Sequence, residues 1–352
     1  MKLDSLSDLM QQADIQFTVF DLGRRINRIS PQLFSRIEQA DVAYPYPFKQ
    51  HAWIGLVGWQ NSNKKEHFIW FIQLPLDELG LIDPVARDEI VQYLVKQIEN
   101  KLLLKTAEPK SPQKGSLPHG FTPGEESMAV FHSKVSLLLG HPASKHYQPV
   151  RDYLTGKQGY DQWAFLTVQG LADITSRIDE ENNQALLLKA LPNIPETPFS
   201  LICRLLEHQA INDEIASSLI QRITSESNSI ESNHNKSTEL VAVIRGVSFM
   251  QNIEKRQSFL QQVLAGTAAN DIEVLAAIAG RCWDDLKTQT LGKMFLTALA
   301  ANNQGQHGFD NIVVDLLTLP GLREPIMSAM RSPERSAELT TAMGTFFSRL
   351  TK

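Results

Sequence analysis

The chain has 352 residues, of which 42% are hydrophobic and 21% are charged, and its formal net charge is −5. This composition excludes a disordered or fibrous protein and is typical of a globular chain with room for about two domains. The negative balance argues against bulk electrostatic attraction to nucleic acid or to anionic membranes, although a local basic patch could still attract them.

The patterns of residues 3–40 predict a helix, a pair of strands and a second helix. Residues 3–13 place leucines along one side of a short amphipathic helix. Residues 15–29 alternate apolar and polar side chains, which predicts a pair of strands bending near Gly23. Ser30 and the proline after it predict a helix that runs to about Ala40, because serine can cap free amides and proline has the backbone angle of a first turn.

Residues 51–76 predict a β-hairpin, and both of its faces are apolar. Trp53 and Trp59 share one face of the first strand, while Trp70 alternates with apolar neighbours on the second. An antiparallel sheet usually leaves one face polar, so this sheet needs a cover on both sides. A helix predicted over residues 84–104 can cover one face. The second cover could be the rest of the chain, a second copy in a homodimer, or a different protein.

The domain organisation follows from a change in composition. Residues 1–104 predict a small α+β domain with an antiparallel sheet, and residues 105–126 are rich in proline and glycine, as in a linker. Residues 127–352 then lack strand patterns and predict an all-α domain, with one of its helices over residues 160–178 and a flexible loop at residues 225–236.

The helical segments recur at a roughly constant spacing. Similar apolar segments align through Leu201, Leu240, Val274 and Ile312, at intervals of 39, 34 and 38 residues. This is the period of helix-pair repeats, in which stacked neighbours complete a shared core. The pattern predicts a helical-repeat domain of the HEAT-like kind, and a helical bundle without repeats is the alternative.

Motifs for catalysis or metal binding are weak. The sequence has no glycine-rich nucleotide loop and no hydrolase elbow, and its S-x-x-K match, from Ser111 to Lys114, lies in the proline-rich linker. His132, His141 and His146 have no metal-ligand spacing and are interpreted as turn and surface residues. We therefore predict no catalytic residue, no metal and no cofactor.

Basic and aromatic residues near the first strands are candidates for binding. Arg24, Arg25 and Arg28 could meet phosphates while nearby rings stack on bases, but Asp14 and Asp21 can pair with them, which favours a structural role. The run AYPYPF supplies Tyr44 and Tyr46, which could form a recognition loop or cap the sheet edge.

The cellular compartment is predicted from what the chain lacks. Its two cysteines, Cys203 and Cys282, lie in apolar helical runs and suggest no disulfide framework. The N-terminus does not resemble a signal peptide, and no apolar run is long enough to span a bilayer. A cytoplasmic protein without membrane contact is expected.

The strings FDLGRRINRIS and AYPYPFKQHAWIGLVGW, followed by the helical tail, resemble a family of uncharacterised gammaproteobacterial proteins of similar length, a domain of unknown function. The resemblance covers nearly the whole chain. It implies a bacterial cytoplasmic protein and supplies neither an activity nor catalytic residues.

These observations favour a non-enzymatic interaction or scaffold protein that binds another protein, or a second copy of itself, through its helical-repeat surface or its aromatic sheet face. The candidate contact residues are Trp53, Trp59, Trp70, Tyr44, Tyr46, Arg24 and Arg25. Two alternatives stay open: an enzyme with a pocket between the two domains, and a nucleic-acid-binding protein that uses Arg24, Arg25 and Arg28.

Overall fold

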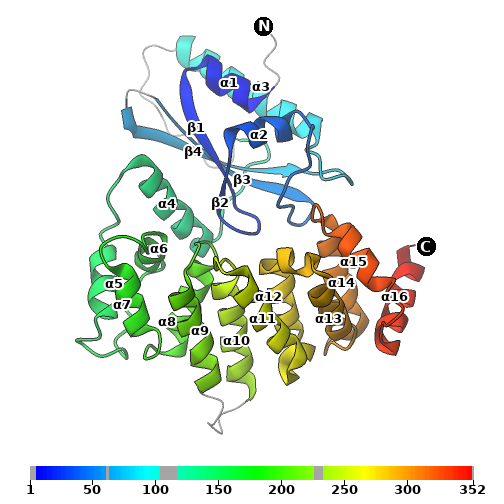
Figure 1. Cartoon of the computed structure of the whole chain (residues 1–352). Helices are drawn as coiled ribbons and strands as arrows, with labels where there is room; N and C mark the ends of the chain where they lie inside the picture. Colours follow the sequence, from blue (N-terminus) through cyan, green and yellow to red (C-terminus); the bar gives the residue numbers. More distant parts are fainter. Residues whose placement is uncertain (1–4, 61–62, 104–116, 226–232, 351–352) are drawn as a thin grey trace. The chain divides into compact units, whose positions relative to one another are not determined.

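The computed structural model describes residues 5–60, 63–103, 117–225 and 233–350. The chain divides into two compact units, Met1–Ser127, here called the sheet unit, and Met128–Lys352, the helical unit (Figure 1). The described part of the sheet unit has a four-stranded antiparallel sheet with helices, and the helical unit has helices in place of strands. The predicted order of an α+β region followed by a helical region is confirmed.

The sheet unit contains the strands and helices that the residue patterns predict. They are α1 (Leu6–Gln12), β1 (Ile15–Asp21), β2 (Asn27–Ile29), α2 (Pro31–Glu38), β3 (His51–Gln60), β4 (Asn63–Pro75) and α3 (Pro84–Leu103).

Side-chain caps explain where the first two helices begin. Ser30 caps α2 as predicted, because its hydroxyl accepts a hydrogen bond from the Leu33 amide at 3.2 Å. The Glu38 carboxylate, at the end of α2, accepts the amides of Leu6 and Ser7 at 2.8 and 3.1 Å. Burial raises the pKa of Glu38. This carboxylate therefore ties the first turn of α1 to the last turn of α2.

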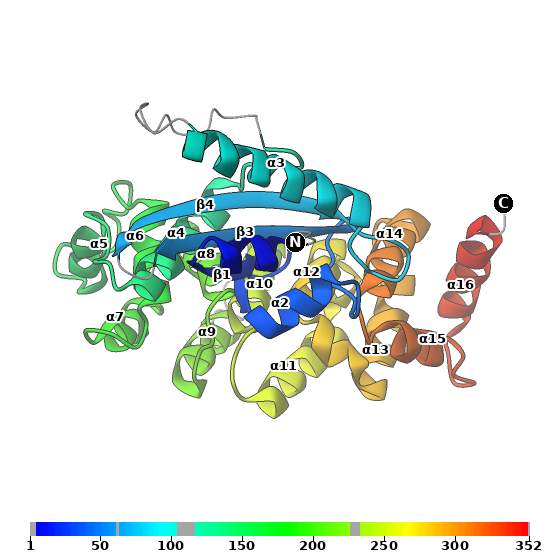
Figure 2. The same cartoon turned by 90° about the horizontal axis from the view of Figure 1, so that it is seen from above.

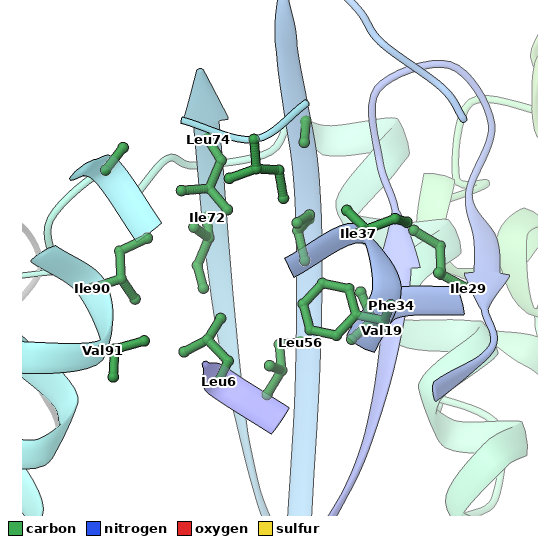
Figure 3. Close-up of a cluster of buried hydrophobic side chains, with 14 of the residues drawn as sticks. Leu6, Val19, Ile29, Phe34, Ile37, Leu56, Ile72, Leu74, Ile90 and Val91 are labelled. Carbon is green, nitrogen blue, oxygen red and sulfur yellow. The ribbon is translucent and has the colours of Figure 1, made fainter. Parts of the chain in front are cut away.

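The strand order is β2-β1-β3-β4, and the register assigns each side chain to a face. Val19 pairs with Leu56, which pairs with Trp70, so these three side chains share one face. The core of the sheet unit lies between this face and the three helices α1, α2 and α3, which all lie on the same side of the sheet (Figures 1, 2 and 3). The predicted helix over residues 84–104 thus contributes to the cover of one face.

The second face of the sheet is apolar as well. It carries Phe20 and Val57, which are buried, and Trp53, Trp59 and Phe71, which are half-buried. Trp53 and Trp59 therefore lie on the second face, whereas Trp70 lies on the helix-covered face with Phe68, at a ring distance of 4.4 Å.

Residues 117–124, which the composition assigns to a linker, lie against the sheet. Gly120 forms an antiparallel bridge with Ile72 on the outer edge of β4, and the Phe121 amide donates to the Phe71 carbonyl at 3.2 Å. The Phe121 ring packs on Trp53 at 4.9 Å between ring centres. Backbone pairing with β4 and the packing of one aromatic side chain together hold this stretch against the sheet. Residues 105–116 of the predicted linker lie outside the described part.

The helical unit begins within α4 and continues to the end of the described chain. Its helices are α4 (Glu125–Leu139), α5 (Tyr147–Leu154), α6 (Val168–Ser176), α7 (Asn183–Ala190), α8 (Glu196–Leu206), α9 (Asp213–Ser225), α10 (Asn233–Val247), α11 (Ile253–Ala265), η2 (Thr267–Asn270), α12 (Ile272–Arg281), η3 (Trp283–Lys287), α13 (Gln289–Ala300), α14 (Gly305–Thr318), α15 (Arg323–Met330) and α16 (Ala337–Leu350).

Alternate helices of this unit pack against one another. One row runs α6, α8, α10, α12, α14 and α16, with each helix in contact with the next. In the other row α5 contacts α7 and α7 contacts α9, and further on α11 contacts α13 and α13 contacts α15. Contacts of this kind join most of these helices to the one two places later in the chain, as in stacked helix pairs.

Two predicted boundaries in the helical unit are wrong. The helix predicted over residues 160–178 begins only at Val168, because Thr167 caps it by accepting the Gly170 amide at 3.1 Å. The loop predicted over residues 225–236 is shorter, since α10 begins at Asn233; residues 226–232 lie outside the described part. Polar residues in the first turn of a helix give no apolar period, so the pattern missed that turn.

Among the described residues, each helix is too short or too polar to cross a bilayer.

Candidate functional site

A buried carboxylate organises the loop that joins β1 to β2. The Asp21 side chain accepts hydrogen bonds from the amides of Gly23, Arg24 and Arg25 at 3.2, 3.2 and 3.3 Å. The chain can turn back on its own carboxylate in this way because an aspartate reaches amides two to four residues ahead. Residues 22–26 are here called the arginine loop.

A tyrosine from a distant segment completes the set of donors. The Tyr44 hydroxyl donates to Asp21 at 2.6 Å, and both side chains are fully buried. Burial raises the pKa of Asp21 to about 6, although the bonds from Tyr44 and the amides oppose the shift. Burial, followed by the charge of Asp21, raises the pKa of Tyr44 well above its usual range. Tyr44 is therefore a neutral donor at all ordinary pH values.

The Arg24 guanidinium is directed inward. Its Nε donates to the Pro47 carbonyl at 2.7 Å, and its charge lies 5.9 Å from the centre of the Phe48 ring. The Trp53 indole donates to the Phe48 carbonyl at 2.8 Å. The arginine loop, the segment 44–48 and the start of β3 are thus joined by polar contacts.

A strained turn lies beside this cluster. Phe48 and His51 pair across a two-residue turn in which Lys49 and Gln50 have φ values of 50° and 58°. Two consecutive positive φ values favour asparagine and glycine, so lysine and glutamine adopt this conformation at a cost. Both side chains are exposed.

The structure brings five of the seven predicted contact residues together. The amides of Arg24 and Arg25 and the Tyr44 hydroxyl bind Asp21 directly. Tyr46 meets the Tyr44 ring edge to face at 6.4 Å, and Trp53 is linked to the cluster through the Phe48 carbonyl. Tyr44, Arg24 and Arg25 are buried, while Tyr46 and Trp53 are half-buried. We call this group the Asp21 cluster. Its buried members stabilise the conformation of the arginine loop.

Trp59 and Trp70 do not belong to the Asp21 cluster. Trp59 pairs with Gln16 at the opposite end of β1 and β3, about 20 Å from Trp53 at the usual rise of a strand. Trp70 lies on the other face of the sheet. The three tryptophans therefore form no common patch in the sheet unit.

The sequence analysis missed an aromatic loop in the helical unit. Residues 155–167 connect α5 to α6 without regular structure, and Gly156 and Gly159 have φ values of 70° and 82°. The loop carries Trp163, which is half-buried, and Phe165, which is 51% exposed. The run GYDQWAFL gave a signal, because three aromatic residues follow a glycine, a residue that often marks a turn or loop.

Hydrogen bonds tie the aromatic loop to α5 and α7. The Tyr153 hydroxyl, from α5, donates to the Tyr160 carbonyl at 2.8 Å, and the Lys189 ammonium donates to the Thr155 carbonyl at 2.8 Å. The Tyr153 ring meets the edges of Tyr160 and Phe165 at 5.7 and 6.3 Å. Burial, followed by the charges of Tyr160 and Asp161, raises the pKa of Tyr153 to about 12.

Buried arginine–carboxylate pairs recur along the helical unit. Glu207, after α8, is bound by Arg245 of α10 and by Arg281 of α12, each within 3.0 Å. Burial alone would raise the pKa of Glu207, but the charge of Arg281 and the hydrogen bond from Arg245 outweigh it and lower the pKa to about 2. Similarly, Arg256 binds Asp285 through Nε at 2.7 Å. The pairs of Glu207 join the end of α8 to α10 and α12, and the pair of Arg256 joins α11 to η3.

The described residues contain no group of histidine, cysteine and acidic side chains that could hold a metal ion. His132 is exposed, and His141 and His146 are half-buried. Cys203 and Cys282 are both buried free thiols, and burial raises the pKa of Cys203 above its usual range.

Comparison with known protein families identifies the family of the chain. Residues 1–347 match the family described as protein of unknown function DUF3549. The chain belongs to this family, which confirms the resemblance to an uncharacterised domain that the strings of the sheet unit suggested. No curated protein and no solved structure matches the chain.

Proposed function

We propose that this protein is a non-enzymatic interaction protein that binds another protein through its helical unit. The observation that carries the proposal is the packing of alternate helices into rows, which is typical of helical-repeat arrays of the HEAT-like kind. Such arrays stack their units side by side and present extended surfaces, on which partner proteins bind.

The aromatic loop supports a particular contact point on this surface. It is a loop fixed by hydrogen bonds, and it presents Phe165 to solvent beside Trp163. Loops on a rigid scaffold often carry binding residues, and aromatic anchors dominate the energetics of protein interfaces. Phe165 is therefore the first residue to test.

The test compares two variants that lose similar exposed apolar side chains. Phe165→Ser removes the anchor, and Ile253→Ser, at the start of α11, is the matched control because Ile253 is 55% exposed. Tagged wild-type protein and both variants are used for affinity capture from the native host, with quantitative mass spectrometry and a thermal melt to verify folding.

We expect at least one protein to be captured equally by the wild type and the control but about 30-fold less tightly by Phe165→Ser, the effect of losing about 2 kcal/mol of binding free energy. Equal capture by both variants would remove the aromatic loop from the interface. A wild-type protein that retains no protein above the level of an unrelated tagged chain would overturn the interaction function itself.

The three tryptophans of the sheet unit differ in whether they are candidates for partner binding. The Trp53 indole is bound to the Phe48 carbonyl and packed on Phe121, so it serves the sheet unit internally. Trp59 and Trp70 are half-buried, and alanine variants at these two positions test whether either face of the sheet contributes to partner binding or to a homodimer.

The nucleic-acid alternative is less well supported. The Arg24 guanidinium is directed to Pro47 and Phe48, and Arg28 is the exposed member of the three arginines. Filter binding with single-stranded nucleic acid at low salt tests this alternative, because phosphate contacts give a steep dependence on salt.

A further inference from the structure

The aromatic loop combines an exposed ring with an indole donor on one turn. The Leu166 amide donates to the Trp163 carbonyl at 3.0 Å, so residues 163–166 form a tight turn with Ala164 and Phe165 at its tip. Both tip residues are exposed, and Trp163 is half-buried. Within the described part of the chain, no group accepts the N–H of the Trp163 indole. The turn therefore offers a ligand both an apolar surface and a hydrogen-bond donor.

This turn rests on side chains that are themselves fixed. The buried Tyr153 ring meets the edge of Phe165 at 6.3 Å, and the Tyr153 hydroxyl donates to the Tyr160 carbonyl at 2.8 Å. Gly156 has a φ of 70°, and a Cβ there would come within 2.7 Å of the Tyr160 hydroxyl. Phe165 is thus supported by Tyr153 while 51% of its surface is exposed. A ligand meets a preformed surface, so binding orders few groups of the loop.

The loop does not suit the other common modes of peptide recognition. Addition of a strand needs a sheet edge, and the described part of the helical unit contains no strand. Recognition of an acidic or phosphorylated segment needs clustered arginines, whereas Lys157 and Asp161 are the charged residues of the loop and balance each other. A helix needs a long apolar groove, and among the described residues between Val85 and Ile253, Phe165 is the one large hydrophobic residue that is exposed.

We propose that the aromatic loop binds a proline-rich segment of a partner protein in the polyproline II conformation, an inference that rests on the interaction function proposed above. Such a segment has no internal hydrogen bonds, so its carbonyls are available to a donor such as the Trp163 indole. Its proline rings pack on aromatic side chains such as Phe165, and this mode needs no charge on the loop. The partner segment is therefore uncharged and rich in proline.

Fluorescence anisotropy with the full chain tests this inference. The probes are a fluorescein-labelled oligoproline and a labelled glycine–serine peptide of the same length. The proteins are the wild type, Trp163→Phe, Phe165→Ser and the control Ile253→Ser, each verified by a thermal melt. Trp163→Phe keeps an aromatic ring but removes the N–H donor, so it separates the hydrogen bond from the packing.

We expect the wild type and Ile253→Ser to bind the oligoproline and not the glycine–serine peptide. Trp163→Phe should weaken binding about fivefold by the loss of one hydrogen bond, and Phe165→Ser about tenfold or more by the loss of the anchor. The inference is overturned if the wild type does not bind the oligoproline or binds both probes equally. It is also overturned if all four proteins bind the oligoproline alike, or if a glucose oligosaccharide binds in place of the oligoproline.

Failure of this inference can be told apart from failure of the proposed function. If capture from the native host depends on Phe165 but the oligoproline is not bound, the loop binds a protein segment of another kind, and this inference alone fails. If neither measurement depends on Phe165, the aromatic loop is not part of the interface.

Discussion

Gln50, in the turn with Lys49, allows a test of backbone strain at a single exposed position. Both residues adopt positive φ in the turn before β3, where their side chains are exposed. Glycine enters this region freely, so we expect Gln50→Gly to raise the free energy of unfolding of the sheet unit by about 0.5–1 kcal/mol. Denaturant unfolding followed by tryptophan fluorescence measures the change.

The control for the turn is Gln50→Ala. Alanine has the same steric cost at positive φ as glutamine, so its effect should stay within about 0.5 kcal/mol of zero. A gain in stability of equal size in both variants would mean that the effect comes from the lost side chain rather than from the backbone.

Sequence reasoning at the level of single residues identified the right neighbourhood but not the bonds from the backbone. It considered the charges of Asp21 and the nearby arginines, and it did not predict that the carboxylate accepts the backbone amides of Arg24 and Arg25. A short side chain reaches amides two to four residues ahead easily. The hydrogen bond from Tyr44 joins residues 23 positions apart, and a local sequence pattern cannot predict a contact over that separation.

Glycines within helices of the helical unit provide a paired test at the level of elements. A Cβ at Gly170 in α6 would come within 2.6 Å of the His146 carbonyl, which belongs to backbone and cannot move aside. A Cβ at Gly344 in α16 would meet nothing within 4 Å. We expect Gly170→Ala to lower the free energy of unfolding by about 1–3 kcal/mol and Gly344→Ala to raise it by up to about 1 kcal/mol.

Thermal and denaturant unfolding of the two alanine variants measure these opposite signs. Because the substitution is the same, a shared sign would show that helix propensity, and not the close approach of α6 to the start of α5, decides the result.

The buried pair of Arg256 and Asp285 tests how the helices are joined. Arg256 in α11 donates to Asp285 at 2.7 and 3.1 Å and also to the Met250 carbonyl. We expect Arg256→Met to cost about 3–5 kcal/mol, because it leaves a buried charge without its partner. The double variant with Asp285→Asn should cost less than the single variant Arg256→Met, since it removes that charge. A double-mutant cycle from denaturant unfolding measures the coupling, and additive losses would contradict it.

Sequence periodicity predicted the elements better than their ends. Ser30 marked the start of α2 because its cap is local, and the alternation in β3 assigned Trp53 and Ile54 to opposite faces. The start of α6 was missed because apolar residues in the aromatic loop imitate a helical stripe. Their side chains turn toward Tyr153, which no one-dimensional period encodes.

The two units should respond to acid in opposite directions. In the sheet unit the folded pKa of Asp21 lies near 6, above 3.8, so the stability linked to it is complete below pH 3.8 and about 3 kcal/mol is lost as the pH rises through 6. In the helical unit the folded pKa of Glu207 lies near 2, below 4.5. Its contribution of about 3 kcal/mol is present above pH 4.5 and is lost as the pH falls toward 2.

Peptide-level hydrogen exchange under mildly denaturing conditions separates the two units in one experiment. Between pH 7 and pH 4 we expect peptides from the sheet unit to gain protection, and between pH 4.5 and pH 2 we expect peptides around Glu207 to lose it. A single pH dependence shared by both units would contradict the contrast between a carboxylate held by dipoles and one held by arginines.

At the scale of the chain, the residue patterns predicted the architecture but not the function. The change from alternating to helical patterns separated the two kinds of architecture, because the periods of strand and helix differ. The packing of residues 117–124 on the sheet could not be predicted, because Phe121 contacts Trp53 and Phe71, which are distant in the sequence. The aromatic loop was missed for a similar reason, since its conformation depends on contacts with Tyr153 in another element.

The row packing of the helical unit also bears on how such a chain can change its length in evolution. Because a helix touches the helix two places later, an insertion or deletion of a whole helix pair preserves the contacts of the remaining helices, whereas the loss of a single helix would exchange the two rows. Members of the family that differ in length should therefore differ by paired steps after α4, while the region from β1 to β3, closed by the bond between Asp21 and Tyr44, should keep its spacing.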